Sequence, residues 1–102
     1  MNIAVLTPDR DIFQGAISSV KVPGVNGEFQ VLNNHAPIVS ALEEGKVEIV
    51  TAGGEYTYFD LDDNASKTAS GAGQQVAFLI EGGFVEVLNN EVSLLVQGVR
   101  RM

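Results

Sequence analysis

Apolar and polar residues alternate along most of the chain with a period of two, the pattern of half-buried β-strands. Turn-forming pairs such as Asn26-Gly27, Gly53-Gly54 and Asn89-Asn90 separate the alternating runs and indicate hairpins. The predicted strands cover residues 1–6, 12–14, 17–22 and 28–31, a run that starts at residue 46, and residues 55–61, 76–80, 85–87 and 92–96.

Three segments depart from this simple alternation. Within residues 17–22 the apolar positions change phase, which predicts a β-bulge or a strand buried on both faces. Residues 33–45 fit a short helix or a short strand, because Pro37 suits a first helical turn whereas the β-branched pair Ile38-Val39 suits a strand. Residues 62–75 (DDNASKTASGAGQQ) contain no large apolar side chain, so we expect a mobile polar surface loop there.

About nine short strands, joined mostly by hairpins, are typical of a β-sandwich or a β-barrel. No run predicts a long helix, and the chain contains no internal repeat that we can find. A length of 102 residues suits one domain with one continuous core. The sequence therefore predicts a single all-β domain over residues 1–102.

The chain is acidic and contains no cysteine. Its 13 Asp and Glu residues outnumber 6 Lys and Arg residues, giving a formal net charge of −7. This charge repels phosphate backbones and anionic membranes, so nucleic-acid binding is not expected. Without cysteine there are no disulfides or thiolate metal sites, and a reducing compartment is favoured. No segment has the length and apolarity of a membrane span or the pattern of a signal peptide, so we expect a cytoplasmic chain.

Residue chemistry alone predicts neither catalysis nor a cofactor. His35 is the only histidine, and no acid is placed behind it as a catalytic triad requires. We interpret it as a turn histidine whose ring bonds to the local backbone, or as an exposed interface residue. Residues 60–64 (DLDDN) resemble the start of a calcium loop, but Ala65 stands at the central glycine and Gly71 at the twelfth-position glutamate. We therefore interpret residues 60–64 as a solvated acidic segment.

A binding module of another class is the alternative hypothesis. Tyr56 and Tyr58 share a strand face, and small carbohydrate-binding β-sandwich modules bind sugars on exposed aromatic rings. Such modules usually present tryptophan, which this chain lacks, and paired tyrosines on a strand more often pack within a sheet.

One segment supports a more specific hypothesis. Residues 22–42 (VPGVNGEFQVLNNHAPIVSAL) closely resemble the N-terminal domain of the F-type ATP synthase epsilon subunit, which carries the pattern V-P-G-x-x-G-E-F-G-V-L-P-G-H-A-P, two hydrophobic residues and S-A-L. Residues 6–15 (LTPDRDIFQG) are similar to the family's T-P-x-x-x-x-F-x-G opening, and residues 80–87 (IEGGFVEV) to its S-G-G-F-V-E-V strand pair. The resemblance covers almost the whole chain except the polar insert.

The resemblance implies a β-sandwich of ten strands in two sheets, mostly antiparallel and without long helices, with a short strand from Ile38. It implies a non-catalytic subunit, without a cofactor, in the rotor stalk of the proton-translocating enzyme. The implied partners are the gamma subunit and the c-ring, whose rotation is coupled through gamma to ATP synthesis. The implied location is peripheral, on the cytoplasmic side of the bacterial inner membrane.

The resemblance also implies which residues form the subunit interface. Its motif positions near the c-ring and gamma are Glu28, Asn33, Asn34, His35 and Ser40. Acidic and hydrogen-bonding groups there would meet basic and polar loop residues by electrostatic complementarity. Glu28 also fits an ordinary outward position on its strand, so both interpretations stay open for it.

Four features depart from the family pattern. Asn33-Asn34 replaces Pro-Gly, which the turn tolerates because Asn adopts positive φ more readily than other side-chain-bearing residues. Gln30 replaces a glycine, which changes the details of the expected contact with the c-ring. The insert after Asp62 is longer than the usual hairpin loop. The chain ends at Met102, so we expect no C-terminal helical hairpin and, with it, no nucleotide binding or helical inhibition.

Overall fold

The computed structural model describes residues 1–102 and contains ten strands and no helix. The strands are β1 (Asn2–Leu6), β2 (Asp11–Gly24), β3 (Gly27–Leu32), β4 (Ile38–Leu42), β5 (Gly45–Thr51), β6 (Glu55–Asp60), β7 (Ala65–Ser70), β8 (Gln75–Ile80), β9 (Gly82–Leu88) and β10 (Glu91–Gln97). The structure contains no helix that is long and apolar enough to cross a membrane.

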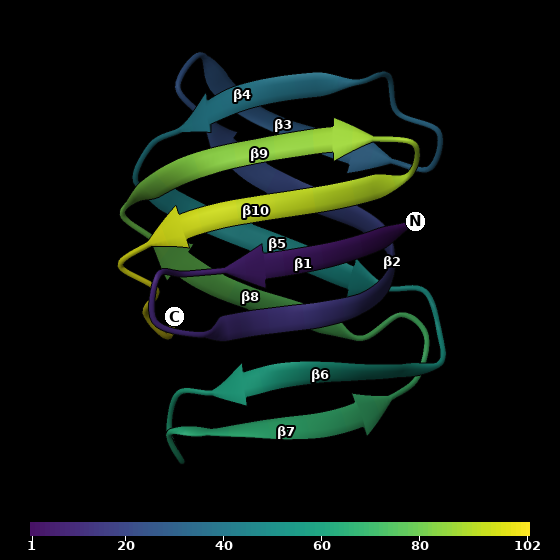
Figure 1. The fold of residues 1–102 in the computed structure, drawn as a ribbon, viewed down its shortest axis with the longest axis vertical. Coiled ribbons are helices and arrows are strands. Elements are labelled where there is room, and N and C mark those ends of the chain that lie inside the picture. The colour runs from purple at the N-terminus through teal and green to yellow at the C-terminus, as the bar shows by residue number, and fades with distance from the viewer.

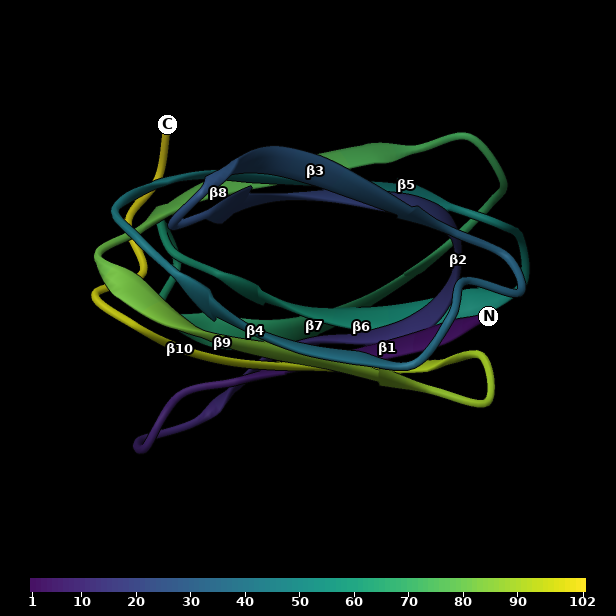
Figure 2. The same cartoon turned by 90° about the horizontal axis from the view of Figure 1, so that it is seen from above.

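The strands form two layers packed face to face, as Figure 2 shows. One layer contains β4, β9, β10, β1, the first half of β2, β6 and β7, and the other contains β3, the second half of β2, β5 and β8 (Figure 1). Neighbouring strands are antiparallel except β1 and β10, which are parallel. The predicted all-β sandwich of ten strands is therefore confirmed.

The long strand β2 belongs to both layers. Its first half pairs with β1, and its second half pairs with β5 on one side and with β3 on the other. The register between β2 and β5 shifts between Ile17 and Ser19, so the predicted bulge is confirmed. Because the extra residue reverses the alternation, Ile17, Val20 and Val22 are all fully buried although they belong to different phases.

The core lies between the two layers and consists of the inward members of the alternating runs. Phe13, Ile17, Ile49, Ile80 and Leu94 are the largest side chains with almost no exposed surface. Burying a side chain of this kind stabilises the folded state by about 1.5–3 kcal/mol. The inward alternation therefore supplies most of the driving force for this fold.

The ambiguous segment after β3 forms the short strand β4 rather than a helix. Its residues pair in antiparallel register with β9, from Ile38 opposite Val87 to Leu42 opposite Gly83. Backbone hydrogen bonds to β9, a strand distant in sequence, thus decide between helix and strand where the local sequence fitted both.

The expectation of a polar loop over residues 62–75 is wrong for its middle part, which forms β7. This strand pairs with β6 from Glu55 opposite Ser70 to Asp60 opposite Ala65, and β6 pairs with β2. The β6–β7 hairpin lies at the margin of its layer (Figure 1). A strand there needs no apolar side chains of its own, because backbone hydrogen bonds form its ladder while its side chains stay largely in solvent.

Candidate functional site

The predicted interface residues lie along the β3 and β4 margin of the sandwich (Figure 1). Glu28 lies at the start of β3 opposite Pro23, His35 follows the end of β3, and Ser40 lies in β4 opposite Val85. From Glu28 to the end of β3 the chain spans about 13 Å, at about 3.3 Å per residue. Glu28 and His35 therefore mark the two ends of one margin and do not form a single cluster.

A β-turn after β3 presents His35. The backbone N–H of His35 donates to the carbonyl oxygen of Leu32 at 3.1 Å, which closes the turn. Asn34, the third residue of the turn, has φ of 63°, whereas Asn33 before it does not have positive φ. This combination is that of a type II turn, in which glycine or asparagine occupies the third position. Asn34 thus adopts the conformation for which the family pattern has glycine.

Two amide side chains join this turn to the β9–β10 turn. The backbone N–H of Asn34 donates to Oδ1 of Asn90 at 2.6 Å, and Nδ2 of Asn90 donates to Oδ1 of Asn34 at 3.1 Å. We call this reciprocal pair the Asn34–Asn90 clasp. The N-terminal amino group adds a hydrogen bond to Oδ1 of Asn33 at 3.0 Å. Three segments far apart in sequence therefore meet around the His35 turn.

The imidazole of His35 bonds to its own loop. Its Nδ1 lies 2.7 Å from the carbonyl oxygen of Ala36. Because a carbonyl oxygen only accepts, Nδ1 carries the hydrogen in this contact. The predicted bond between the ring and the local backbone is confirmed.

Glu28 and Ser40 differ in how far they reach into solvent. Glu28 is exposed. The hydrogen bond from Lys46 Nζ to Glu48, at 2.8 Å, is the main reason that the pKa of Lys46 is raised, and the negative charge of Glu28 raises it further. Ser40 is half-buried, because it shares the inward face of β4 with Leu42, and its hydroxyl donates to the carbonyl of Ala41 at 3.4 Å. Glu28 is therefore the more accessible of the two.

The outer face of the β4, β9, β10 and β1 layer carries exposed apolar side chains that the sequence reasoning did not single out. Val39 is 71% exposed, Phe84 58%, Leu95 53% and Leu88 51%. Together with the half-buried Leu6, we call these residues the outer apolar patch.

Strand register joins three residues of this patch in one row, whereas the exposed Glu86 separates Phe84 from Leu88 and lies opposite Val39. Phe84 lies opposite Leu95 across β9 and β10, and Leu95 lies opposite Leu6 across β10 and β1. These three side chains line a hollow of about 480 Å³, and Val39 and Leu88 line a second one of about 250 Å³. Exposed large apolar side chains gathered on one face mark an interaction site. Its sequence signal is in β9, where the outward Phe84 and Leu88 are apolar although the inward Val85 and Val87 already supply the buried face.

Comparisons with known proteins place the chain in a family. A family model described as "ATP synthase, Delta/Epsilon chain, beta-sandwich domain" matches residues 1–65. The ATP synthase epsilon chain of Chlorobaculum tepidum is 39% identical over 95 residues, which cover 93% of this chain and 86% of that relative. The chain belongs to the ATP synthase delta/epsilon family. The epsilon chain of Salinibacter ruber is 31% identical over 99 residues, and the match covers 97% of this chain but only 59% of that relative.

Solved structures show the same fold. A chain in the Euglena gracilis mitochondrial ATP synthase (OSCP/F1/c-ring) matches with a TM-score of 0.71 at 19% identity, over 96% of this chain and 51% of that chain. A chain in the Tetrahymena thermophila mitochondrial ATP synthase (central stalk/c-ring) matches with a TM-score of 0.66 at 19% identity, over 99% of this chain and 66% of that chain.

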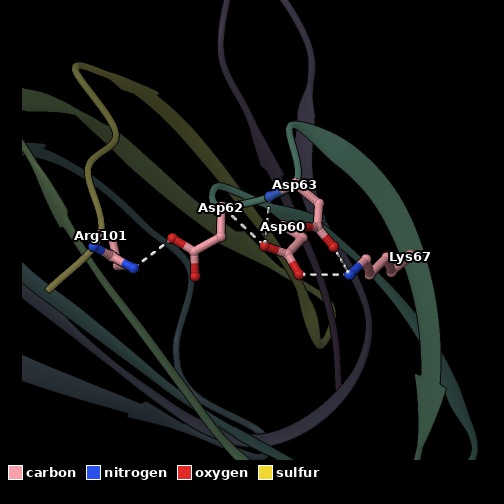
Figure 3. A network of polar contacts seen from close by, with 5 residues as sticks. All are labelled: Asp60, Asp62, Asp63, Lys67 and Arg101. Atoms are coloured by element: carbon pink, nitrogen blue, oxygen red, sulfur yellow. Dashed lines mark hydrogen bonds and ion pairs between the residues drawn. The ribbon is translucent and has the colours of Figure 1, made fainter.

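The acidic residues of the β6–β7 turn in this epsilon-family domain have local partners (Figure 3). Oδ1 of Asp60 accepts the backbone N–H groups of Asp62 and Asp63 at 2.9 and 3.2 Å. Lys67 lies between Asp60 and Asp63 and bonds to both, and Arg101 bonds to Asp62. The hydrogen bond from Lys67 lowers the pKa of Asp60 below its usual value, and the two carboxylates raise the pKa of Lys67. The Lys67 ammonium group thus pairs with two of the carboxylates of the acidic segment at residues 60–64.

The tyrosine pair does not form an exposed platform. Tyr56 is 8% exposed and stacks on Phe13, with ring centroids 5.4 Å apart and 25° between the ring planes. Tyr58 is half-buried beside it, at 6.1 Å between centroids. The two rings fix the β6–β7 hairpin to the core, so the alternative hypothesis of a carbohydrate-binding module loses its proposed site.

Proposed function

We propose that this domain is a non-catalytic component of the rotor stalk of an F-type ATP synthase. In this role it joins the gamma subunit to the c-ring and supports the coupling of proton transport to ATP synthesis. Its proposed location is peripheral, on the cytoplasmic side of the bacterial inner membrane, as part of the complex. Membership of the delta/epsilon family and the relatives named ATP synthase epsilon chain support this proposal.

The outer apolar patch is the observation that carries the proposal. A rotor subunit must hold two neighbours at once, and this domain has two suitable surfaces. The apolar side chains of Phe84, Leu95 and Val39 suit a stable, largely apolar contact, which we assign to gamma. The polar margin with Glu28 and the His35 turn suits the polar loops of the c-ring.

A binding measurement with purified gamma tests this assignment. Phe84→Asp places a charge at the centre of the patch, and we expect it to weaken binding to gamma at least tenfold, since a desolvated charge is costly in an interface. Thr68→Asp is the matched control, because Thr68 is exposed on β7, away from the patch. Thermal unfolding shows whether both variants remain folded.

Two results would contradict the proposal. The first is a wild-type domain that does not co-purify with tagged gamma. The second is equal binding by the wild type and the folded Phe84→Asp variant, which would place the gamma contact elsewhere.

A further inference from the structure

The His35 turn lacks the residues that usually make such a turn rigid. Proline at the second position and glycine at the third predispose a chain to a type II turn, and this chain has Asn33 and Asn34 there. An asparagine with φ of 63° is tolerated but not favoured by its own backbone. The turn conformation therefore depends more on contacts from outside the turn than it would with Pro-Gly.

The Asn34–Asn90 clasp supplies such contacts. Asn90 lies 56 positions away in sequence, in the turn between β9 and β10. Its own backbone is anchored, because φ of 62° places it in a two-residue hairpin turn with Asn89 and its carbonyl accepts the N–H of Asn2 at 3.0 Å. A fixed residue thus holds both the N–H and the side chain of Asn34, the residue with the unfavourable φ.

We propose that Asn90 is a positioning residue for the His35 turn. By fixing Asn34, it holds His35 in one conformation at the margin that faces the c-ring, so that binding does not have to order the turn. This inference rests on the proposed function for its consequence, but the clasp itself is independent of any partner. Pre-ordering of this kind increases affinity because less conformational entropy is lost on binding.

Amide hydrogen exchange on the free domain tests the clasp. In Asn90→Gly the backbone keeps its positive φ while the side chain is lost, so the β9–β10 turn is retained. We expect the Asn34 amide to exchange about fivefold faster in this variant, the effect of losing one net hydrogen bond of ordinary strength. The matched control is Asn89→Gly, because Asn89 has φ of 52° in the same turn but does not join the clasp. Exchange of the Asn34 amide in this control should stay within about twofold of the wild type.

Affinity for the isolated c-ring tests the consequence. We expect Asn90→Gly to weaken binding about threefold to tenfold and Asn89→Gly to leave it unchanged, with similar melting temperatures for both. The double variant Asn33→Pro with Asn34→Gly makes the turn rigid by itself, so adding Asn90→Gly to it should no longer lower the affinity. A merely structural role of Asn90 would not be rescued in this way.

The outcomes separate the two proposals. Unchanged exchange of the Asn34 amide in Asn90→Gly, an equal effect of Asn89→Gly, or failure of the Pro-Gly background to restore affinity would overturn the role of Asn90. If the wild-type domain does not bind the c-ring, or His35→Ala binds as well as the wild type, the proposed interface is wrong, whereas the exchange measurement still decides whether the clasp holds the turn.

Discussion

At the scale of single residues, Gly83 shows how a missing side chain permits two strands to pair. A Cβ atom at this position would lie 2.2 Å from the carbonyl oxygen of Leu95, and its φ of 151° is one that residues with side chains rarely adopt. We therefore expect Gly83→Ala to lower the free energy of unfolding by about 2–4 kcal/mol, measured by urea denaturation. The backbone of β10 cannot withdraw without losing its ladder with β9.

The neighbouring glycine provides the control for this prediction. A Cβ atom at Gly82 would meet its nearest atom, the carbonyl oxygen of Leu42, at an ordinary 3.5 Å, and its φ is not positive. Gly82→Ala should therefore change stability by less than about 1 kcal/mol. Similar losses in both variants would show that close approach of β10 is not what requires glycine at position 83.

At the scale of elements, alternation predicted most of the strands whose inward side chains are apolar, left the short β4 open between helix and strand, and missed β7. Residues such as Val85 and Leu94 are apolar because they face a core, and that constraint is visible in the sequence. β7 is under a much weaker constraint, since Ser66, Thr68 and Ser70 are exposed and only the small Ala69 packs against the core. Its backbone pairing with β6 leaves no periodic trace in its own residues.

The candidate site likewise contains residues that the sequence could locate and residues that it could not. The residues of the turn, such as His35, belong to one contiguous motif, so the resemblance located them. Asn90 holds that turn from 56 positions away, and no local pattern links two asparagines across such a distance. The outer apolar patch likewise assembles from four strands, and only strand register brings Leu6 beside Leu95. Both features depend on tertiary pairing, which the sequence does not display.

The β6–β7 turn carries a prediction about pH. The hydrogen bond from Lys67, together with the N–H groups of Asp63 and Asp62, lowers the pKa of Asp60 below 3.8, and Asp60 and Asp63 raise the pKa of Lys67 above 10.5. Their contribution to stability is therefore present between these two values. It is lost as the pH falls through the folded-state pKa of Asp60, or rises through that of Lys67.

A titration of the Asp60 carboxyl by carbon NMR tests this ion pair. In Lys67→Met we expect the pKa of Asp60 to rise towards 3.8 without reaching it, because the N–H groups of Asp62 and Asp63 still donate to the carboxylate. Lys21→Met is the control, since Lys21 pairs with Glu48 on another part of the surface. An unchanged pKa of Asp60 in Lys67→Met would mean that the ion pair does not persist in solution.

At the scale of the whole molecule, the β6–β7 hairpin is separate from both proposed contact surfaces. It is inserted between β5 and β8, which pair directly from Gly45 opposite Ile80 to Val50 opposite Gln75. The two ends of the insertion lie close together, because a Cβ atom at Gly53 would be 3.8 Å from that of Ala72. Deleting residues 54–71 would therefore leave a short turn that joins an intact pair of strands.

We expect the domain without residues 54–71 to fold and to bind gamma and the c-ring as the full chain does, because β4, β9, β10 and β1 pair with no deleted residue and the His35 turn has no hydrogen bond to one. Its free energy of unfolding should fall by about 3–5 kcal/mol, since the buried ring of Tyr56 no longer covers Phe13. Tyr56→Ala, which keeps the hairpin, should cause most of the same loss. If deletion abolishes binding by a domain that is still folded, the hairpin is part of the interface, and the two-surface arrangement would have to include a third contact.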